Sequence, residues 1–173
     1  SQAPQVMGQL KNISQKQAQE DVSQLSQQEL VSALAQKDKT TLGIIGYDRA
    51  YQHGLVQRYV VMNEAKIAKR FLDMANDPEK LKLDSGEFLD SLSSERDAFM
   101  GELMEEFGGN ANRENAIKAL GGKVTDGLIS QTTESFLKNK EYQATTVLSS
   151  NFSDNVRDMG FKDAMGIYRT ELQ

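Results

Sequence analysis

Apolar side chains recur every three or four residues through a proline-free stretch between Thr41 and Pro78. This spacing is typical of one face of an α-helix and differs from the alternation of a β-strand. Because proline disfavours a helical conformation in the residue before it, we expect one long helix near residues 42–77. At 1.5 Å per residue it would be about 50 Å long. A helix of that length must pack along a bundle or against neighbouring subunits.

The rest of the chain favours helix as well. It has only two prolines in 173 residues, and its abundant Gln, Glu, Lys, Ala and Leu are good helix formers. β-branched and aromatic residues do not gather in alternating runs, so strands have little support. We therefore predict an all-α fold, an elongated helical bundle of five to seven helices. A hydrophobic content of 38% without tryptophan indicates a modest core or an elongated shape.

Two regions differ in composition. Residues 1–25 are rich in Gln and Ser, and we interpret them as an N-terminal arm, partly helical, that either orders against a partner or remains a frayed tail. Residues 26–173 form the predicted helical domain. The final residues "YRTELQ" contain no helix stop, so one expectation is that the domain continues beyond position 173.

Capping and glycine residues predict helix boundaries. Ser26 and Glu29 form a capping box before an apolar run. Gly108-Gly109 and Gly121-Gly122 predict helix ends, and the Thr- and Ser-rich segment around 149–153 predicts a further break. Other predicted helix starts are Asp84 or Ser85, Asn110 or Asn112, and Thr125 or Asp126.

The composition of the chain argues against several classes of function. The formal net charge is -5 and no basic run exceeds two residues, whereas proteins whose main partner is nucleic acid usually carry a basic face. The absence of cysteine excludes disulfides, thiolate metal sites and a cysteine nucleophile. No apolar stretch of about 18 residues exists that could form a transmembrane helix.

Few residues of the chain are candidates for catalysis or metal binding. His53 is the only histidine, so a metal site with two histidines is impossible. Glu102, Glu105 and Glu106 lie close in sequence and could bind a cation, but no Glu-x-x-His accompanies them, and a solvated acidic face is the simpler interpretation. The segment 84–90 lacks the spacing of a calcium loop, and 121–127 lacks that of a phosphate loop. We expect no catalytic residue, cofactor or metal, and no enzyme activity.

Three segments together resemble a known class of protein. They are "GYDRAYQHGLVQRYVVMNEAKIAKRFLDM", "GEFLDSLSSERDAFMGEL" and "GLISQTTESFLKNKEYQATTVLSSNF". In pattern and composition, residues 44–152 resemble the internal virion proteins of short-tailed bacteriophages, also called ejection or core proteins. The likeness contains no diagnostic motif. Some members have transglycosylase activity, which needs a catalytic glutamate that we cannot place in this chain.

The resemblance implies a structural virion protein. Such a protein self-assembles inside the capsid near the portal and takes part in genome ejection. It would contact the portal or other internal virion proteins, lie near DNA without sequence specificity, and reach the host cell envelope on ejection. The alternative is a secreted bacterial helical protein, such as a type III secretion effector, translocator or regulator. A small hydrolase with an unrecognised site is a third hypothesis.

The tyrosines of the long predicted helix suggest how it assembles. Tyrosine is enriched at subunit interfaces because its ring can be buried while its hydroxyl keeps a polar partner. A second apolar set, which includes Val56 and Val60, points elsewhere, and two stripes suit a helix between two neighbours. The predicted interface residues are Tyr47, Tyr51, Leu55, Tyr59 and Met62.

Overall fold

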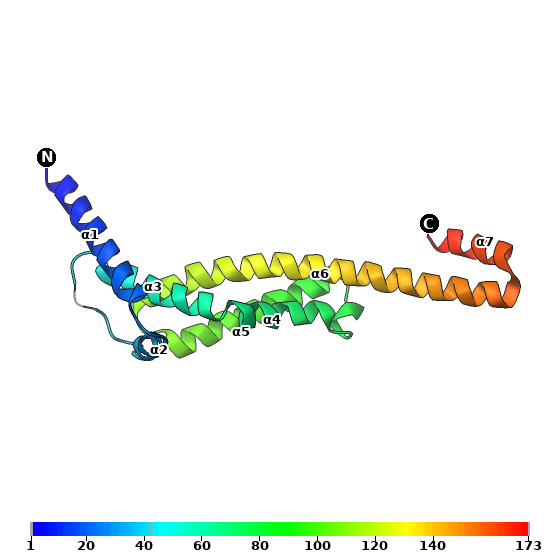
Figure 1. Cartoon of the computed structure of the whole chain (residues 1–173), viewed down its shortest axis with the longest axis horizontal. Coiled ribbons are helices and arrows are strands. Elements are labelled where there is room, and N and C mark those ends of the chain that lie inside the picture. Colours follow the sequence, from blue (N-terminus) through cyan, green and yellow to red (C-terminus); the bar gives the residue numbers. More distant parts are fainter. Residues whose placement is uncertain (1, 42, 173) are drawn as a thin grey trace.

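The structure, a computed structural model, describes residues 2–41 and 43–172, without the side chains at 161, 162 and 164 (Figure 1). The described residues form helices and no strand, which confirms the all-α prediction. The elements in order are α1 (Ala3–Ser23), α2 (Gln27–Ala35), α3 (Tyr47–Met62), α4 (Glu64–Asn76), the 3-10 turn η1 (Lys80–Lys82), α5 (Ser85–Phe107), α6 (Ala111–Met159) and α7 (Phe161–Glu171).

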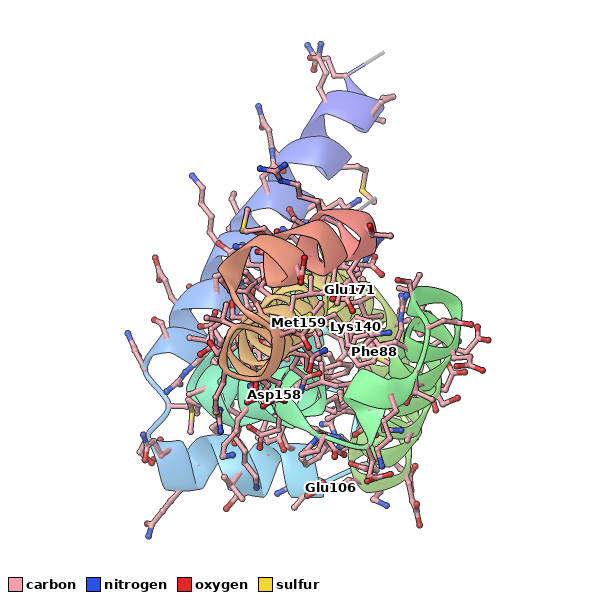
Figure 2. The ribbon with its side chains drawn as sticks, turned by 90° about the vertical axis from the view of Figure 1, so that its right-hand side faces the viewer. Phe88, Glu106, Lys140, Asp158, Met159 and Glu171 are labelled. Carbon is pink, nitrogen blue, oxygen red and sulfur yellow. The ribbon has the colours of Figure 1, made fainter. Side chains whose placement is uncertain are left out.

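Helix α6 is the axis of an elongated molecule (Figure 1). Its first half packs against α3, α4 and α5, while α1 crosses α3 at one end. Beyond Lys140, which still contacts the segment after η1, the helix runs out of the bundle beside α7, which folds back along it after Gly160. In the view along the long axis, α7 and α2 lie on opposite sides of α6 (Figure 2). The molecule is therefore a short bundle with one long projecting hairpin.

Aromatic residues fill the core of the bundle. Phe88 of α5 stacks on Phe136 of α6 with ring centroids 3.8 Å apart. Phe71 of α4 meets Phe99 edge to face at 6.5 Å. Such contacts add about 0.5–1.5 kcal/mol each to the free energy gained by burying apolar surface. They join α4, α5 and α6 into one hydrophobic cluster.

The long helix predicted near 42–77 is divided in the structure, so its prediction as one helix was wrong. α3 and α4 follow each other with a break at Asn63 (φ -105°, ψ 10°), whose side-chain amide donates to the carbonyl of Tyr59 at 2.8 Å. The first helix begins at Tyr47, because Gly46 has a left-handed φ of 89° that a helix cannot continue. Residue 42 lies outside the described residues.

The predicted helix end at Gly121-Gly122 was also wrong, because α6 continues through this pair. Gly121 is buried, and a Cβ there would lie only 2.5 Å from Sδ of Met100. The glycine therefore serves close packing of α5 on α6. Thr125 is buried within the helix and donates to the carbonyl of Gly121 at 2.7 Å, so it is no cap, nor is Asp126.

Other boundaries follow the sequence. The capping box of Ser26 and Glu29 is present, and Asp84 forms a second one with Glu87. Asn110 caps α6, and α5 ends at Phe107 just before Gly108-Gly109. The break predicted around 149–153 is absent, since α6 ends only at Met159. Much of the region interpreted as an arm is helix α1, whose second half is packed on α3 through Ala18 and Val22.

We predict that Phe99→Ala and Leu103→Ala each lower the free energy of unfolding by ~2–5 kcal/mol, as large-to-small changes in a core do. Both side chains are buried on the face of α5 that meets the bundle. Leu89→Ala, on the exposed side of the same helix, is the matched control and should change stability by less than about 0.5 kcal/mol. Urea unfolding followed by circular dichroism measures all three. Wild-type stability of the first two variants would contradict the assignment of this face to the core.

Candidate functional site

Arg113 is fully buried where four helices meet. It lies in the first turn of α6, which begins when the side-chain oxygen of Asn110 accepts a hydrogen bond from the Arg113 backbone N–H at 3.0 Å. Only 1% of the residue is exposed. The cap thus positions a cation inside the bundle, where an uncompensated charge would cost several kcal/mol.

The five N–H donors of this guanidinium all find acceptors. Nε donates to the side-chain oxygen of Gln52 at 2.9 Å. Nη1 donates to the carbonyls of Leu34 (2.8 Å) and Phe107 (3.2 Å). Nη2 donates to the carbonyls of Ala33 (3.1 Å) and Gln36 (3.4 Å).

These carbonyls belong to the C-terminal ends of α2 and α5, where the last turn of a helix has no internal donors and carries a partial negative charge. One arginine of α6 therefore holds the ends of two other helices and, through Gln52, also α3. Burial lowers the pKa of Arg113, whereas the nearby charge of Asp48 favours the protonated form.

Asp48 supplies the balancing charge through an intermediary. The side-chain amide of Gln52 donates to Asp48 at 3.1 Å and so joins the carboxylate to Arg113. Asp48 also accepts from the backbone (2.8 Å) and hydroxyl (2.7 Å) of Thr41 and from Asn112 (2.7 Å). Burial alone would raise the pKa of Asp48, but these hydrogen bonds lower it to about 2. The network ties the loop before α3 to the start of α6.

Similar hydrogen bonds satisfy backbone carbonyls at the ends of other helices. Arg58 of α3 donates to the carbonyl of Val22 (2.6 Å), in the last turn of α1, and to that of Leu25 (2.8 Å), just beyond it. Asn139 of α6 donates to the carbonyl of Ala75 at the end of α4, at 2.7 Å. Side chains from one helix thus satisfy the free carbonyls of another throughout the bundle.

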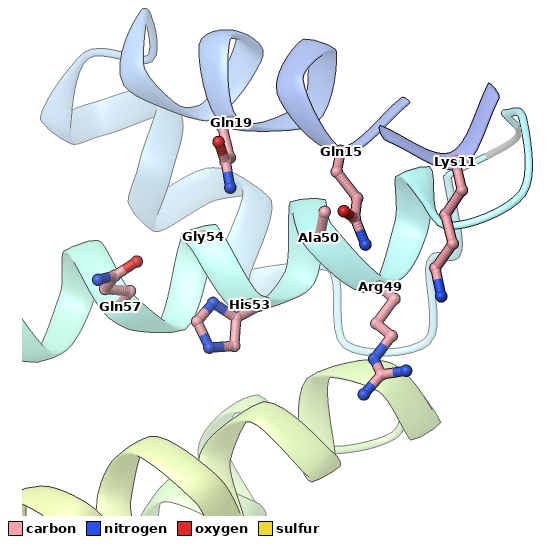
Figure 3. Close-up of a pocket in the computed structure, with 8 residues that line it drawn as sticks. All are labelled: Lys11, Gln15, Gln19, Arg49, Ala50, His53, Gly54 and Gln57. Carbon is pink, nitrogen blue, oxygen red and sulfur yellow. The ribbon is translucent and has the colours of Figure 1, made fainter. Parts of the chain in front are cut away.

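A polar groove lies between α1 and α3, outside the buried network (Figure 3). Lys11, Gln15 and Gln19 border it on α1. Arg49, His53 and Gln57 border it on α3, and the small residues Ala50 and Gly54 lie between the two rows. Its volume is about 490 Å³. His53, the only histidine of the chain, is therefore an exposed residue on the wall of this groove.

The predicted interface residues are partly used inside the chain. Leu55 is fully buried. The hydroxyl of Tyr47 donates to Asp21 of α1; burial and this bond raise the pKa of Tyr47 to about 12. Tyr51 stacks on Tyr47 at 5.8 Å, and Tyr59 meets Phe107 at 4.8 Å. Met62 is exposed. A role for these five residues in assembly stays a prediction.

The acidic group predicted on α5 has a structural contact. Glu102 receives two hydrogen bonds from Arg70 of α4, at 2.6 and 2.9 Å. Among the described residues, no cluster of three or more histidine, aspartate or glutamate side chains could hold a metal ion. Over the same residues, no helix is long and apolar enough to cross a membrane.

Sequence reasoning missed Arg113 and Asp48. A signal for Arg113 existed, because it precedes Ile117 by four residues and Gly121 by eight, and so lies on the buried face of its helix. Nothing local marks Asp48, whose partners come from three separate segments.

Comparisons with known proteins give no family for this chain. No protein-family model matches it, and no curated protein or solved structure is significantly similar to it.

We predict that Arg113→Ala lowers the free energy of unfolding by about 3–5 kcal/mol, because it leaves five acceptors, three of them in buried hydrogen bonds, without their donor. Arg113→Lys should recover only part of this loss, since an ammonium has three donors and no planar fork. Arg157→Ala is the control, because Arg157 is exposed and contacts only Asp154 on its own helix. Chemical unfolding measures each variant, and equal stability of Arg113→Ala and the wild type would contradict the role of the guanidinium.

We predict an acid-sensitive contribution from Asp48. Its pKa is depressed from 3.8 to about 2 on folding. The stabilisation is therefore complete above pH 4 and is lost as pH falls toward 2. Asp48→Asn should be less stable by about 1–2 kcal/mol at pH 5, and this difference should shrink as the pH approaches 2. The test is a series of unfolding curves from pH 5 to pH 2, and parallel profiles of the two proteins would argue against it.

Proposed function

We propose that this chain is a structural protein that works by self-assembly, and that it is an internal virion protein of the kind found in short-tailed bacteriophages. One observation carries the proposal: apolar side chains are exposed on both projecting ends of an elongated bundle, in addition to single exposed ones along its middle such as Val61 and Leu137. A finished single-chain protein seldom leaves helices of this kind without a partner.

At the N-terminal end, α1 projects beyond α3 (Figure 1). Val6, Leu10 and Ile13 lie on one side of this helix because they are spaced by four and three residues. Each is 40–60% exposed. The neighbouring loop adds Ile44 and Ile45, which are also exposed. Because the side chains of this stripe on α1 are already about half covered, a partner that buries them would gain roughly 1 kcal/mol for each.

At the other end, α6 leaves the bundle after Lys140 and runs beside α7. Phe152 and Tyr168 hold this hairpin together, with ring centroids 5.4 Å apart. Outside that contact, Tyr142 is 73% exposed and Val147 57%. Met159, at the hairpin tip, is exposed as well (Figure 2). The projecting hairpin therefore offers a second surface for another subunit or another protein.

These surfaces support a structural rather than a catalytic role. Long helices that pack side by side can build a ring or a tube, as an ejection protein needs. We infer a homo-oligomer inside the capsid, in contact with the portal or other internal virion proteins, and reaching the host cell envelope during genome delivery. The formal net charge of -5 suits a wall along which DNA slides without being gripped.

The alternative, a secreted bacterial helical protein, is favoured by the Gln- and Ser-rich N-terminus. That role suits an unstructured leading segment. Here α1 contains most of this region and its second half is bonded to α3 through Arg58 and Tyr47, which suits assembly better.

We predict that the wild-type protein forms a discrete oligomer and that the double variant Leu10→Ser, Ile13→Ser weakens this association about 10- to 100-fold. Both side chains are exposed on α1, so the fold of the subunit should survive the change. Size-exclusion chromatography with light scattering over a concentration series measures the effect. Gln5→Ser, Gln9→Ser on the same helix is the matched control and should assemble normally. A wild-type protein that stays monomeric at all concentrations would refute self-assembly.

A further inference from the structure

The groove between α1 and α3 is basic, although the chain as a whole is acidic. Its lining contains Lys11, Arg49 and His53 but no aspartate or glutamate. The formal net charge of the protein is -5. The groove therefore differs in sign from the average surface around it, and none of its lining residues belongs to the apolar stripe on α1.

The groove is built by two matching rows of residues. Lys11, Gln15 and Gln19 follow one another at four-residue steps along α1, and Arg49, His53 and Gln57 do the same along α3. This spacing places each row on one side of its helix. In Figure 3, Lys11 and Arg49 reach the same end of the groove, and His53 lies farther along α3.

Small residues keep the helices that form the groove close together. A Cβ on Gly54 would lie 3.1 Å from Val22 of α1, and one on Gly46 would lie 3.2 Å from Lys11. Both positions therefore hold α1 against α3 over three turns. The buried contacts of Val22 and Ala18 fix the same pair of helices. The basic side chains consequently project from a packed scaffold.

The two cations of the groove lack carboxylate partners. In the described part of the chain, neither Lys11 nor Arg49 takes part in an ion pair, whereas Arg70 has two, and Arg96 and Lys138 have one each. Asp48 lines a neighbouring hollow with Lys11 and Arg49, but it forms no ion pair with either of them and accepts from Asn112 and Thr41 instead. Asp21 accepts from Tyr47. Two cations at one end of a groove attract an anion from solution.

Amide groups extend the site on the far side of Arg49. Arg49 and His53 also border a smaller hollow of about 90 Å³ against α6, with Asn112 and Asn115. Side-chain amides donate hydrogen bonds to anionic oxygens without adding charge. Donors therefore surround Arg49 from α1, α3 and α6.

We propose that this groove binds a phosphate group, with Lys11 and Arg49 as the charged contacts and His53 and Gln15 as further donors. Arginine matches phosphate oxygens in a paired geometry, and lysine adds a point charge. A tetrahedral anion presents oxygens to donors in several directions, as the convergence of three helices requires. The groove is larger than a lone phosphate ion, so the group can belong to a free phosphate compound or to the backbone of DNA.

The test is a titration followed by nuclear magnetic resonance, which observes the His53 ring, the Arg49 Nε–H and the side-chain amides of Gln15 and Gln19. Three probes are added separately at constant ionic strength: inorganic phosphate, pyrophosphate and a short DNA duplex. Constant ionic strength removes general screening effects. We expect saturable shifts confined to the groove, and sodium chloride at the same ionic strength should not produce them.

The variant Lys11→Gln, Arg49→Gln should weaken binding at least about tenfold, the loss expected for one or two charged hydrogen bonds. Lys16→Gln, Lys118→Gln is the matched control, with the same change in net charge at exposed positions outside the groove. Circular dichroism checks that both variants fold.

The probes separate the two sources of phosphate. Shifts with phosphate and pyrophosphate alone would assign a small phosphate compound, and shifts with the duplex as well would assign the DNA backbone. The proposal is overturned if no probe gives saturable shifts in the groove, or if the Lys11, Arg49 variant binds as the wild type does. Oligomer size is measured separately by light scattering. The outcome of the phosphate titration therefore neither supports nor refutes the proposed structural role.

Discussion

The buried guanidinium of Arg113 is the constraint on which the arrangement of the helices depends. Among the described residues it is the only charged side chain that is fully buried, and it bonds five acceptors from α2, α3, α5 and the segments that follow them. A buried cation tolerates little change in its surroundings, because each lost acceptor leaves part of a charge unsolvated. The apolar core supplies most of the stability, but it is tolerant of small shifts. Arg113 therefore determines where α2 ends and how α5 meets α6.

The packed middle of the molecule and its exposed apolar ends have different roles in the proposed assembly. In the core between α3 and α6, the apolar residues pack against one another and Arg113 finds all its acceptors within the chain. The stripe on α1 and the projecting hairpin are not satisfied in this way, because apolar side chains there face solvent. Assembly would cover them without rearranging the core. The basic groove lies near the N-terminal end, so a bound phosphate would lie beside one of the proposed assembly surfaces.

Much of the local structure was predictable because its causes are local. The capping box of Ser26 and the cap at Asn110 each depend on residues within one turn, and both are present. The failures depend on contacts between distant segments. Gly121 was predicted to end a helix, but it packs against Met100 of another helix. The break at Asn63 has no proline or glycine to announce it. Arg113 could be placed on a buried face by periodicity, yet four of its five acceptors are backbone carbonyls, which no sequence pattern identifies. The exposed apolar residues on α1 lie in the Gln-rich segment that was expected to order against a partner or to remain frayed.

The central claim is that the core is stable in the single chain, whereas the two projecting ends become stable only on assembly. Hydrogen exchange at two protein concentrations tests this claim most directly. The account predicts that amides of 47–136 are protected equally in dilute and concentrated protein. Amides of 3–13 and 141–171 should exchange rapidly when the protein is dilute and become protected as it is concentrated. Equal protection of the ends in dilute monomer would mean that they are stable without a partner. Rapid exchange of both ends in the concentrated, assembled protein would mean that other surfaces carry the assembly, and either result would contradict the account.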